Sequence, residues 1–336
     1  MPATPPIVRV KPPALQPGDT VGIIAPASNI KRDLLEAGVR RLRDLGYRTS
    51  FLPSILEEDL YFAGSLERRK RELEEMFVRP DVRAVVCARG GYGTNYLLAA
   101  IDLERLRPYP KIFVGYSDVT TLLTYFADAL GMVTFHGPMV AKDFSHPDGV
   151  QISSWKAAFG GSAGWSLEEF SPLKVLVEGA AEGVLYGGCL SMLVASLGTP
   201  YEIRTEGTIL FVEDVGVKPY QIDRMLMQLK LAGKLQGVRG MVFGEMLDCR
   251  QTNDQPYSLP EVILRVVGDL GVPVAWGLRS GHVSQGNLTL PLGVRAAFEA
   301  GRDRVSLRIL EASTVAGDAM VTSQGAEKLD EASRRT

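Results

Sequence analysis

The sequence predicts an α/β fold in two parts: an N-terminal domain with a doubly wound, mostly parallel sheet, then a β-rich α/β domain. In the first half, short apolar runs rich in β-branched residues alternate with segments of helical periodicity. A stretch rich in Gly, Pro, Asp and Ser interrupts this alternation at 141–175. Beyond it, strand and helix patterns resume and end in three β runs near 288–310, which favour antiparallel pairing.

Each element of the N-terminal half is predicted by a local pattern. Residues 20–25 are an apolar run typical of a buried parallel strand. Apolar residues recur at helical spacing from Leu34 to Leu45, and Gly46 ends that helix. The remaining predicted elements are a charged helix at 66–78, strands at 82–87 and 111–114, a helix at 119–130 and a strand at 133–135.

The C-terminal half follows an interdomain connection that holds a short predicted helix at 153–159. Its predicted elements are strands at 207–214, 240–245 and 272–277, helices at 220–233 and 260–271, and the three β runs. We expect four segments: an N-terminal domain at 14–140, a linker at 141–175, a C-terminal domain at 176–312 and a loose tail at 313–336.

The composition excludes several classes of function. Apolar residues make up 46% of the chain and charged residues 23%, as in a globular protein with a substantial core. A formal charge of −2 gives no reason to expect nucleic acid or an anionic membrane as partner. Three widely spaced cysteines predict neither a disulfide framework nor a zinc site. With no signal peptide or membrane-length apolar run, we expect a cytoplasmic protein.

Ser117 follows a predicted buried strand and precedes a predicted helix. At such a turn the free backbone N–H groups of the helix N-terminus can stabilise negative charge. The position is like the nucleophile elbow G-x-S-x-G, except that Val119 stands where the second glycine would be. Serine is also a common helix N-cap, so local sequence leaves capping as an alternative role.

A glycine-rich loop, RGGYG at 89–93, follows the strand at 82–87. Glycines there let a backbone N–H approach a ligand closely. The loop matches neither a dinucleotide-binding fingerprint nor a Walker motif. It is therefore either a tight turn or part of an oxyanion or phosphate site.

Three further polar residues lie at a predicted strand end or in a loop of the second half. Glu213 and Asp214 follow an apolar strand directly, where carboxylates are either solvated or recruited to a site. His282 is one of only three histidines and lies in a Gly- and Ser-rich loop. A serine, an acid and a histidine on three separate loops are the components of a serine hydrolase, although a single loop histidine can also be incidental.

At these residues the chain resembles the LD-carboxypeptidase family of serine peptidases, which also includes microcin C immunity peptidases. The resemblance extends from about residue 18 to residue 310. It rests on seven blocks in order: GDTVGIIAPAS (18–28), ARGGYGTNYLL (88–98), FVGYSDVTTLL (113–123), FHGPM (135–139), EGVLYGGCLSMLVASLGTPY (182–201), LFVEDVGVKPYQIDRMLMQLKLAG (210–233) and GHVSQGNLTLPLG (281–293).

The resemblance implies a catalytic triad with Ser117 as the nucleophile, Glu213 as the acidic member that orients the histidine, and His282 as the base. It implies an oxyanion hole made by the backbone N–H groups of Gly91 and Asp118. Four further residues beside the expected site are candidates for substrate binding: Arg89, Gly90, Tyr92 and Asn287.

The resemblance further implies a homodimer whose active site lies in the crevice between the two domains. Its substrate would be a small peptide ending in a D-amino acid, typically the murein tetrapeptide, which loses D-Ala at an L–D bond. An acyl-enzyme mechanism of this kind needs no metal or organic cofactor.

Two alternatives remain at this level. The first keeps the machinery and cleaves a peptidyl- or aminoacyl-nucleotide antibiotic, for which Trp155 or Trp165 could stack on a base or could simply pack. The second is a non-catalytic two-domain protein that binds a small ligand in its cleft. It gives no reason for Ser117, Glu213 and His282 to converge.

Overall fold

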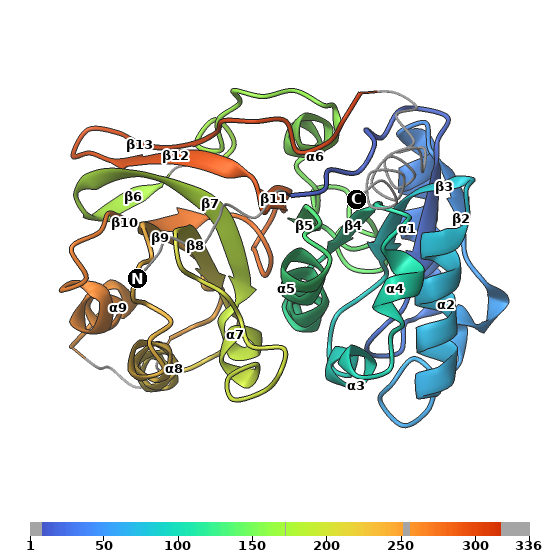
Figure 1. Ribbon diagram of the computed structural model, residues 1–336, viewed down its shortest axis with the longest axis horizontal. Coiled ribbons are helices and arrows are strands. Elements are labelled where there is room, and N and C mark those ends of the chain that lie inside the picture. Colours follow the sequence, from blue (N-terminus) through green and yellow to red (C-terminus); the bar gives the residue numbers. More distant parts are fainter. Residues whose placement is uncertain (1–8, 172, 251–255, 317–336) are drawn as a thin grey trace, which may run out of the picture.

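The structure is a computed structural model that describes residues 9–171, 173–250 and 256–316. Within them the chain forms two sheets that lie side by side, each covered by helices (Figure 1). This arrangement confirms the predicted α/β fold of two parts, the first mostly parallel and the second mixed.

The first sheet has the strand order β11-β5-β4-β3-β1-β2. Five strands run parallel, and β11 is added antiparallel at one edge beside β5. Its strands are β1 (Thr20–Ile24), β2 (Arg48–Ser50), β3 (Val82–Cys87), β4 (Ile112–Gly115), β5 (Thr134–His136) and β11 (Leu290–Leu292). Because β1, β3 and β4 are almost wholly buried, they read in the sequence as continuous apolar runs.

The helices that lie close to their predicted positions in the first half are α1 (Arg32–Asp44), α2 (Leu66–Val78) and α5 (Thr120–Ala129). This half also contains α3 (Thr94–Leu98), α4 (Leu103–Leu106) and the 3-10 turns η1 (Pro53–Leu56) and η2 (Ser117–Val119). The chain leaves α1 at Gly46, whose φ of 92° favours glycine. The short elements β2, α3 and α4 lack a periodic pattern long enough to predict.

The second sheet has the order β13-β12-β7-β8-β9-β10-β6, with parallel strands in the middle and antiparallel strands at both edges. Its strands are β6 (Lys174–Val177), β7 (Gly179–Cys189), β8 (Thr208–Glu213), β9 (Gly240–Gly244), β10 (Val274–Leu278), β12 (Arg295–Ala300) and β13 (Val305–Ile309). Helices α7 (Leu190–Ala195), α8 (Pro219–Leu231) and α9 (Leu259–Val267) lie on one side of it (Figure 1). The long strand β7 is missing from the sequence prediction because small residues and glycines dominate it.

Two segments differ from the expected division of the chain. Strand β11 lies in the segment expected to be C-terminal but completes the first sheet, since Leu290 pairs with His136. The loose tail expected from 313 is wrong for its first residues, because Ser313 and Thr314 are buried and bind carbonyl groups at the end of α6 (Ile152–Phe159). The rest of that expected tail, 317–336, lies outside the described residues.

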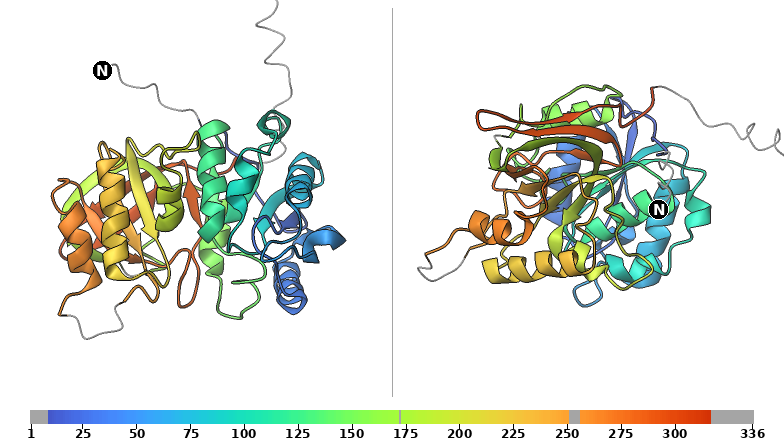
Figure 2. Two further views of the ribbon diagram at one scale, coloured as in Figure 1. Left: turned by 90° about the horizontal axis from the view of Figure 1, so that it is seen from below. Right: turned by 60° about the vertical axis from the view of Figure 1, so that its left-hand side comes forward.

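The two halves meet along α5. This helix contacts β7 and α7 of the second half, and Figure 2 shows the junction from two further directions. Thr120 Oγ1, at the start of α5, accepts a hydrogen bond of 3.1 Å from the backbone N–H of Cys189 at the end of β7. Cys189 in turn pairs with Glu213 at the end of β8. The turn between β4 and α5 is therefore held close to the ends of β7 and β8.

Candidate active site

Ser117 lies at the turn between β4 and α5 in a strained backbone conformation. Its φ is +61°, a left-handed value that serine rarely adopts and that costs about 1–2 kcal/mol. The turn is tight: a Cβ on Gly115 would lie 2.6 Å from the Val119 side chain. Ser117 itself is half-buried, so its hydroxyl keeps access to solvent. Strain of this kind is typical of functional turns, and it does not fit a simple capping serine.

The glycine loop packs directly against this turn. A Cβ on Gly90 would lie 2.9 Å from the Cβ of Ser117, so only glycine fits there. Gly91 has a φ of +108°, and a side chain on it would strike the hydroxyl of Ser28. That hydroxyl accepts a hydrogen bond of 3.1 Å from the N–H of Tyr92. The loop is thus fixed from both sides.

Asp118 is buried and ties the loop to the serine turn. Its Oδ2 accepts a hydrogen bond of 2.8 Å from the N–H of Thr94, and its carbonyl accepts one of 2.6 Å from the Thr94 hydroxyl. Burial raises the pKa of this carboxyl. The side chain therefore has a structural role, while the backbone N–H groups of Gly91 and Asp118 belong to two segments that these bonds hold together.

Glu213 and His282 are brought into direct contact. Glu213 ends β8 and is fully buried, and its Oε2 lies 2.8 Å from His282 Nδ1. The same oxygen accepts a hydrogen bond of 3.0 Å from the backbone N–H of His282. This pairing orients the imidazole and leaves its Nε2 free.

The electrostatics of this pair favour the charged forms. Burial alone would raise the pKa of Glu213, but the charge of His282 and the neighbouring imidazole of His136 outweigh it and lower the pKa to about 2. Burial alone would lower the pKa of His282, but the charge and hydrogen bond of Glu213 raise it above the usual histidine value. The carboxylate therefore stabilises an imidazolium at His282.

Ser117 lies near this pair without being bonded to it. The ring of Tyr116, the residue before Ser117, meets the His282 ring edge-on, with 5.1 Å between centroids. The Tyr116 hydroxyl donates a hydrogen bond of 3.4 Å to Asp143. Among the described residues, no hydrogen bond joins Ser117 to His282. The structure thus brings together the neighbourhoods of the three residues predicted for the triad, and Glu213 and His282 are in contact.

The four candidate substrate-binding residues fall into different places. Arg89 is exposed and donates to the Asn29 carbonyl at 3.2 Å, and Tyr92 is exposed beside other aromatic rings. Gly90 packs on Ser117. Asn287 is fully buried, and its amide exchanges two hydrogen bonds with Gly281. These bonds shape the loop that carries His282, and a substrate contact of Asn287 stays a prediction.

Sequence reasoning missed two polar residues behind the predicted triad. His136 Nε2 lies 3.7 Å from Glu213 Oε1, and His136 Nδ1 lies 2.8 Å from the Ser280 hydroxyl. The signals available were the scarcity of histidine and the position of His136 at the end of a strand. Neither one predicts a contact with Glu213, because the two residues lie in different halves of the chain.

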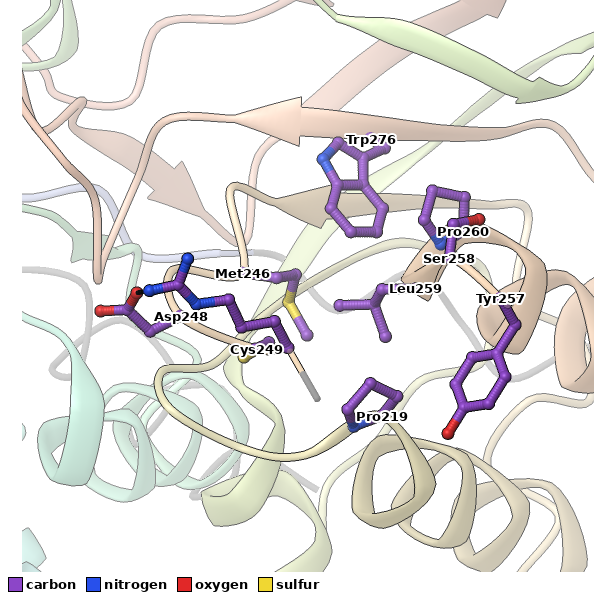
Figure 3. Close-up of a pocket in the computed structure, with 10 residues that line it drawn as sticks. Pro219, Met246, Asp248, Cys249, Tyr257, Ser258, Leu259, Pro260 and Trp276 are labelled. Carbon is purple, nitrogen blue, oxygen red and sulfur yellow. Dashed lines mark ion pairs between the residues drawn. The ribbon is translucent and has the colours of Figure 1, made fainter. Parts of the chain in front are cut away.

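A separate pocket lies at the ends of α8 and α9. Pro219, Met246, Leu259 and Trp276 surround its hollow, as Figure 3 shows. None of the predicted triad residues lines it. In the described part of the chain, no group of His, Cys, Asp and Glu side chains could hold a metal ion. Among the described helices, none has both the length and the apolar character needed to cross a bilayer.

Comparison with known proteins gives a consistent result. The model of the LD-carboxypeptidase N-terminal domain matches residues 21–137, and that of the LD-carboxypeptidase C-terminal domain matches residues 182–298. A probable murein peptide carboxypeptidase of Bacillus subtilis is 41% identical over 87% of this chain and 92% of its own length. The murein tetrapeptide carboxypeptidase of Pseudomonas aeruginosa is 32% identical over 84% of this chain and 94% of its own length.

Solved structures agree on the fold. The microcin self-immunity protein MccF in complex with glutamyl sulfamoyl guanosine superposes with a TM-score of 0.83 at 25% identity. That match covers 91% of this chain and 99% of the other.

Proposed function

The chain belongs to the LD-carboxypeptidase family and is a serine carboxypeptidase, and we propose that Ser117, His282 and Glu213 form its catalytic triad. The observation that carries this proposal is the Glu213–His282 contact of 2.8 Å beside a serine with left-handed backbone. A serine hydroxyl is a weak nucleophile unless an adjacent base removes its proton, so the three roles depend on one another.

In the proposed mechanism His282 Nε2 takes the proton of Ser117 as Oγ attacks the substrate carbonyl. Glu213 holds Nδ1 protonated and stabilises the imidazolium that forms. The N–H groups of Gly91 and Asp118 bind the oxyanion, and each such donor lowers a barrier by about 2.7–4 kcal/mol in enzymes of this kind. His282 then protonates the leaving amine, and water hydrolyses the acyl-enzyme.

The proposed substrate is a small peptide whose C-terminal residue is a D-amino acid, as in the murein tetrapeptide that the Pseudomonas relative is named for. The bond cleaved is the L–D peptide bond that releases D-Ala. Similarity to two murein peptide carboxypeptidases over most of the chain supports this choice.

A second candidate is the cleavage of an aminoacyl nucleotide, which the fold similarity to MccF favours. Trp155 gives this alternative no support, because it is fully buried against Phe144 and Phe159 and its N–H lies 3.3 Å from the Tyr47 hydroxyl. Trp165 packs beside Phe170. The murein peptide is therefore the better-supported substrate.

The test is to incubate the purified protein separately with murein tetrapeptide and with an aminoacyl sulfamoyl adenosine. We expect D-Ala to be released from the first at a far greater rate than amino acid from the second. In Ser117→Ala we expect kcat to fall by at least about 10³-fold with the fold retained. Hydrolysis that persists in Ser117→Ala would remove the nucleophile assignment, and ligand binding without turnover by the wild type would favour a non-catalytic binding protein.

Two further proposals concern the whole protein. We infer that it is cytoplasmic, supported by three cysteines that are all free and buried. We also infer domains at 14–140 and 176–312, supported by the family resemblance. The same resemblance supports a homodimer. Light scattering coupled to size-exclusion chromatography tests the dimer, and a mass of about one chain, 36.6 kDa, would contradict it.

A further inference from the structure

Two buried polar atoms behind the triad face each other with no hydrogen-bond partner. They are Glu213 Oε1 and His136 Nε2, which lie 3.7 Å apart and are both inaccessible to solvent. The other carboxylate oxygen of Glu213 already accepts two hydrogen bonds from His282. An unpaired buried carboxylate oxygen is costly, so the group that faces it matters.

The other ring nitrogen of His136 pairs with Ser280. His136 Nδ1 lies 2.8 Å from the Ser280 hydroxyl oxygen, which also lies 3.0 Å from the carbonyl of Leu288. The hydroxyl can donate its single proton to Nδ1, or it can donate that proton to the carbonyl and accept from Nδ1–H. Nδ1 is therefore satisfied with or without a proton of its own.

Glu213 Oε1 decides between the two states of Nε2. An unprotonated Nε2 would present its lone pair to the lone pairs of an ionised carboxylate, which is repulsive. A protonated Nε2 points its N–H at Glu213 Oε1 and gives both unpartnered atoms a partner. We propose that His136 directs its Nε2–H at Glu213 Oε1, so that one carboxylate serves two histidines and His136 is a positioning residue for the triad.

Among the described residues, Glu213 is the anion paired with the His136 ring. On the strands beside it, β4, β8 and β11, and in the 280 loop, the titratable neighbours are Tyr116, with 5.9 Å between ring centroids, and Glu213. Beyond them lie His282 and Cys189 around Glu213, and Asp143 at the Tyr116 hydroxyl. A Cβ on Gly281 would lie 2.5 Å from the Glu213 carboxyl carbon and 2.8 Å from His136 Cε1, so the space between them admits no side chain there.

The role of His136 follows from this donated N–H and rests on the proposed triad. A donor at the far oxygen of Glu213 draws negative charge away from Oε2 and weakens the hold of that carboxylate on the His282 imidazolium. His282 then gives up its proton more readily and is a competent base at a lower pH than with Glu213 alone. The same contact restrains rotation of the carboxylate, which fixes the His282 ring.

The direct test is ¹⁵N NMR of wild-type protein labelled at its three histidines, with His136 assigned from the signals lost in His136→Asn. We expect Nε2 of His136 to have the shift of a protonated ring nitrogen without substrate. A shift typical of an unprotonated Nε2 would overturn the proposal. Because this measurement needs no turnover, it reads His136 even if the assignment of Ser117 fails.

The kinetic test uses the pH profile of kcat/KM for murein tetrapeptide in His136→Asn and His136→Gln, with exposed His146→Asn as the matched control. We expect the acidic limb of His136→Asn to move to higher pH by up to about one unit and that of His136→Gln to move less, with the control unchanged. Since the glutamine amide can still donate toward Glu213, that variant should retain about tenfold more activity than His136→Asn. A loss of rate with an unmoved acidic limb would reduce His136 to a purely structural residue.

Discussion

At the scale of single residues, the site combines a strained serine with a buried ion pair. Ser117 adopts a φ of +61° because the tight turn at Gly115 and the contact with Gly90 leave it no relaxed alternative. Glu213 stays ionised in a buried position because His282 binds its Oε2 twice. The strain costs stability locally, whereas the lowered pKa of Glu213 and the raised pKa of His282 show that the contact stabilises the charged pair.

The strain at Ser117 predicts that its removal stabilises the protein. Ser117→Gly should raise the free energy of unfolding by up to about 1 kcal/mol, because glycine adopts positive φ without the steric cost that serine bears. Hydrolysis should be lost at the same time. Urea denaturation followed by circular dichroism measures the first effect, and a less stable variant would show that the turn is not strained.

The Glu213–His282 contact predicts the pH dependence of the reaction. The proposed base, His282, must be neutral to act, and Glu213 raises its pKa, so the acidic limb of kcat/KM should lie above the ordinary histidine value of about 6.5. Glu213→Gln removes the charge, so the limb should move to lower pH while kcat falls by about 10⁴-fold. Steady-state rates of D-Ala release from pH 5 to 9 test this. An acidic limb that does not move in Glu213→Gln would show that Glu213 does not set the pKa of His282.

At the scale of elements, the glycine loop and the β4–α5 turn form one unit. Asp118 and Thr94 join them through two hydrogen bonds, and Gly90 lies against the serine itself. The loop reaches the site because β3 and β4 are adjacent parallel strands, whose carboxyl ends meet at the same sheet edge.

Close packing at Gly90 predicts a loss of rate that does not depend on a loss of the fold. Gly90→Ala would place a Cβ 2.9 Å from that of Ser117 and displace the nucleophile or the oxyanion loop. We expect kcat/KM to fall by about 10²-fold with a nearly unchanged melting temperature. Gly301→Ala, at a turn in the second half, serves as control. Wild-type activity in Gly90→Ala would show that the loop gives way without consequence.

At the scale of the whole molecule, the two halves share structure. Strand β11 comes from the C-terminal segment and completes the first sheet. One continuous apolar cluster includes Phe113 and Phe135 of the first half together with Phe211 and Phe298 of the second. Glu213 and His282 of the second half therefore lie beside the Ser117 turn across a packed junction.

This shared core predicts that both halves unfold together. Fluorescence of a variant that keeps only Trp155, in the first half, and of one that keeps only Trp276, in β10, should give coincident urea transitions. For each variant, the urea transition measured by fluorescence is compared with the transition that the same variant shows by circular dichroism. Two separated transitions would show that the halves are independent units.

The sequence by itself determined most of the elements, because hydrophobic periodicity and turn residues act locally. Helices α1 and α2 and strands β1 and β3 lie within a few residues of their predicted bounds. It also pointed to Ser117, Glu213 and His282, through their positions at strand ends and the family resemblance.

Only the tertiary structure decided how those residues relate to each other. The left-handed backbone of Ser117, the burial of Asn287 and the approach of His136 to Glu213 depend on contacts between segments far apart in the chain. Strand β11 crosses to the first sheet for the same reason: pairing partners are chosen by packing of the whole molecule, and no local pattern encodes them.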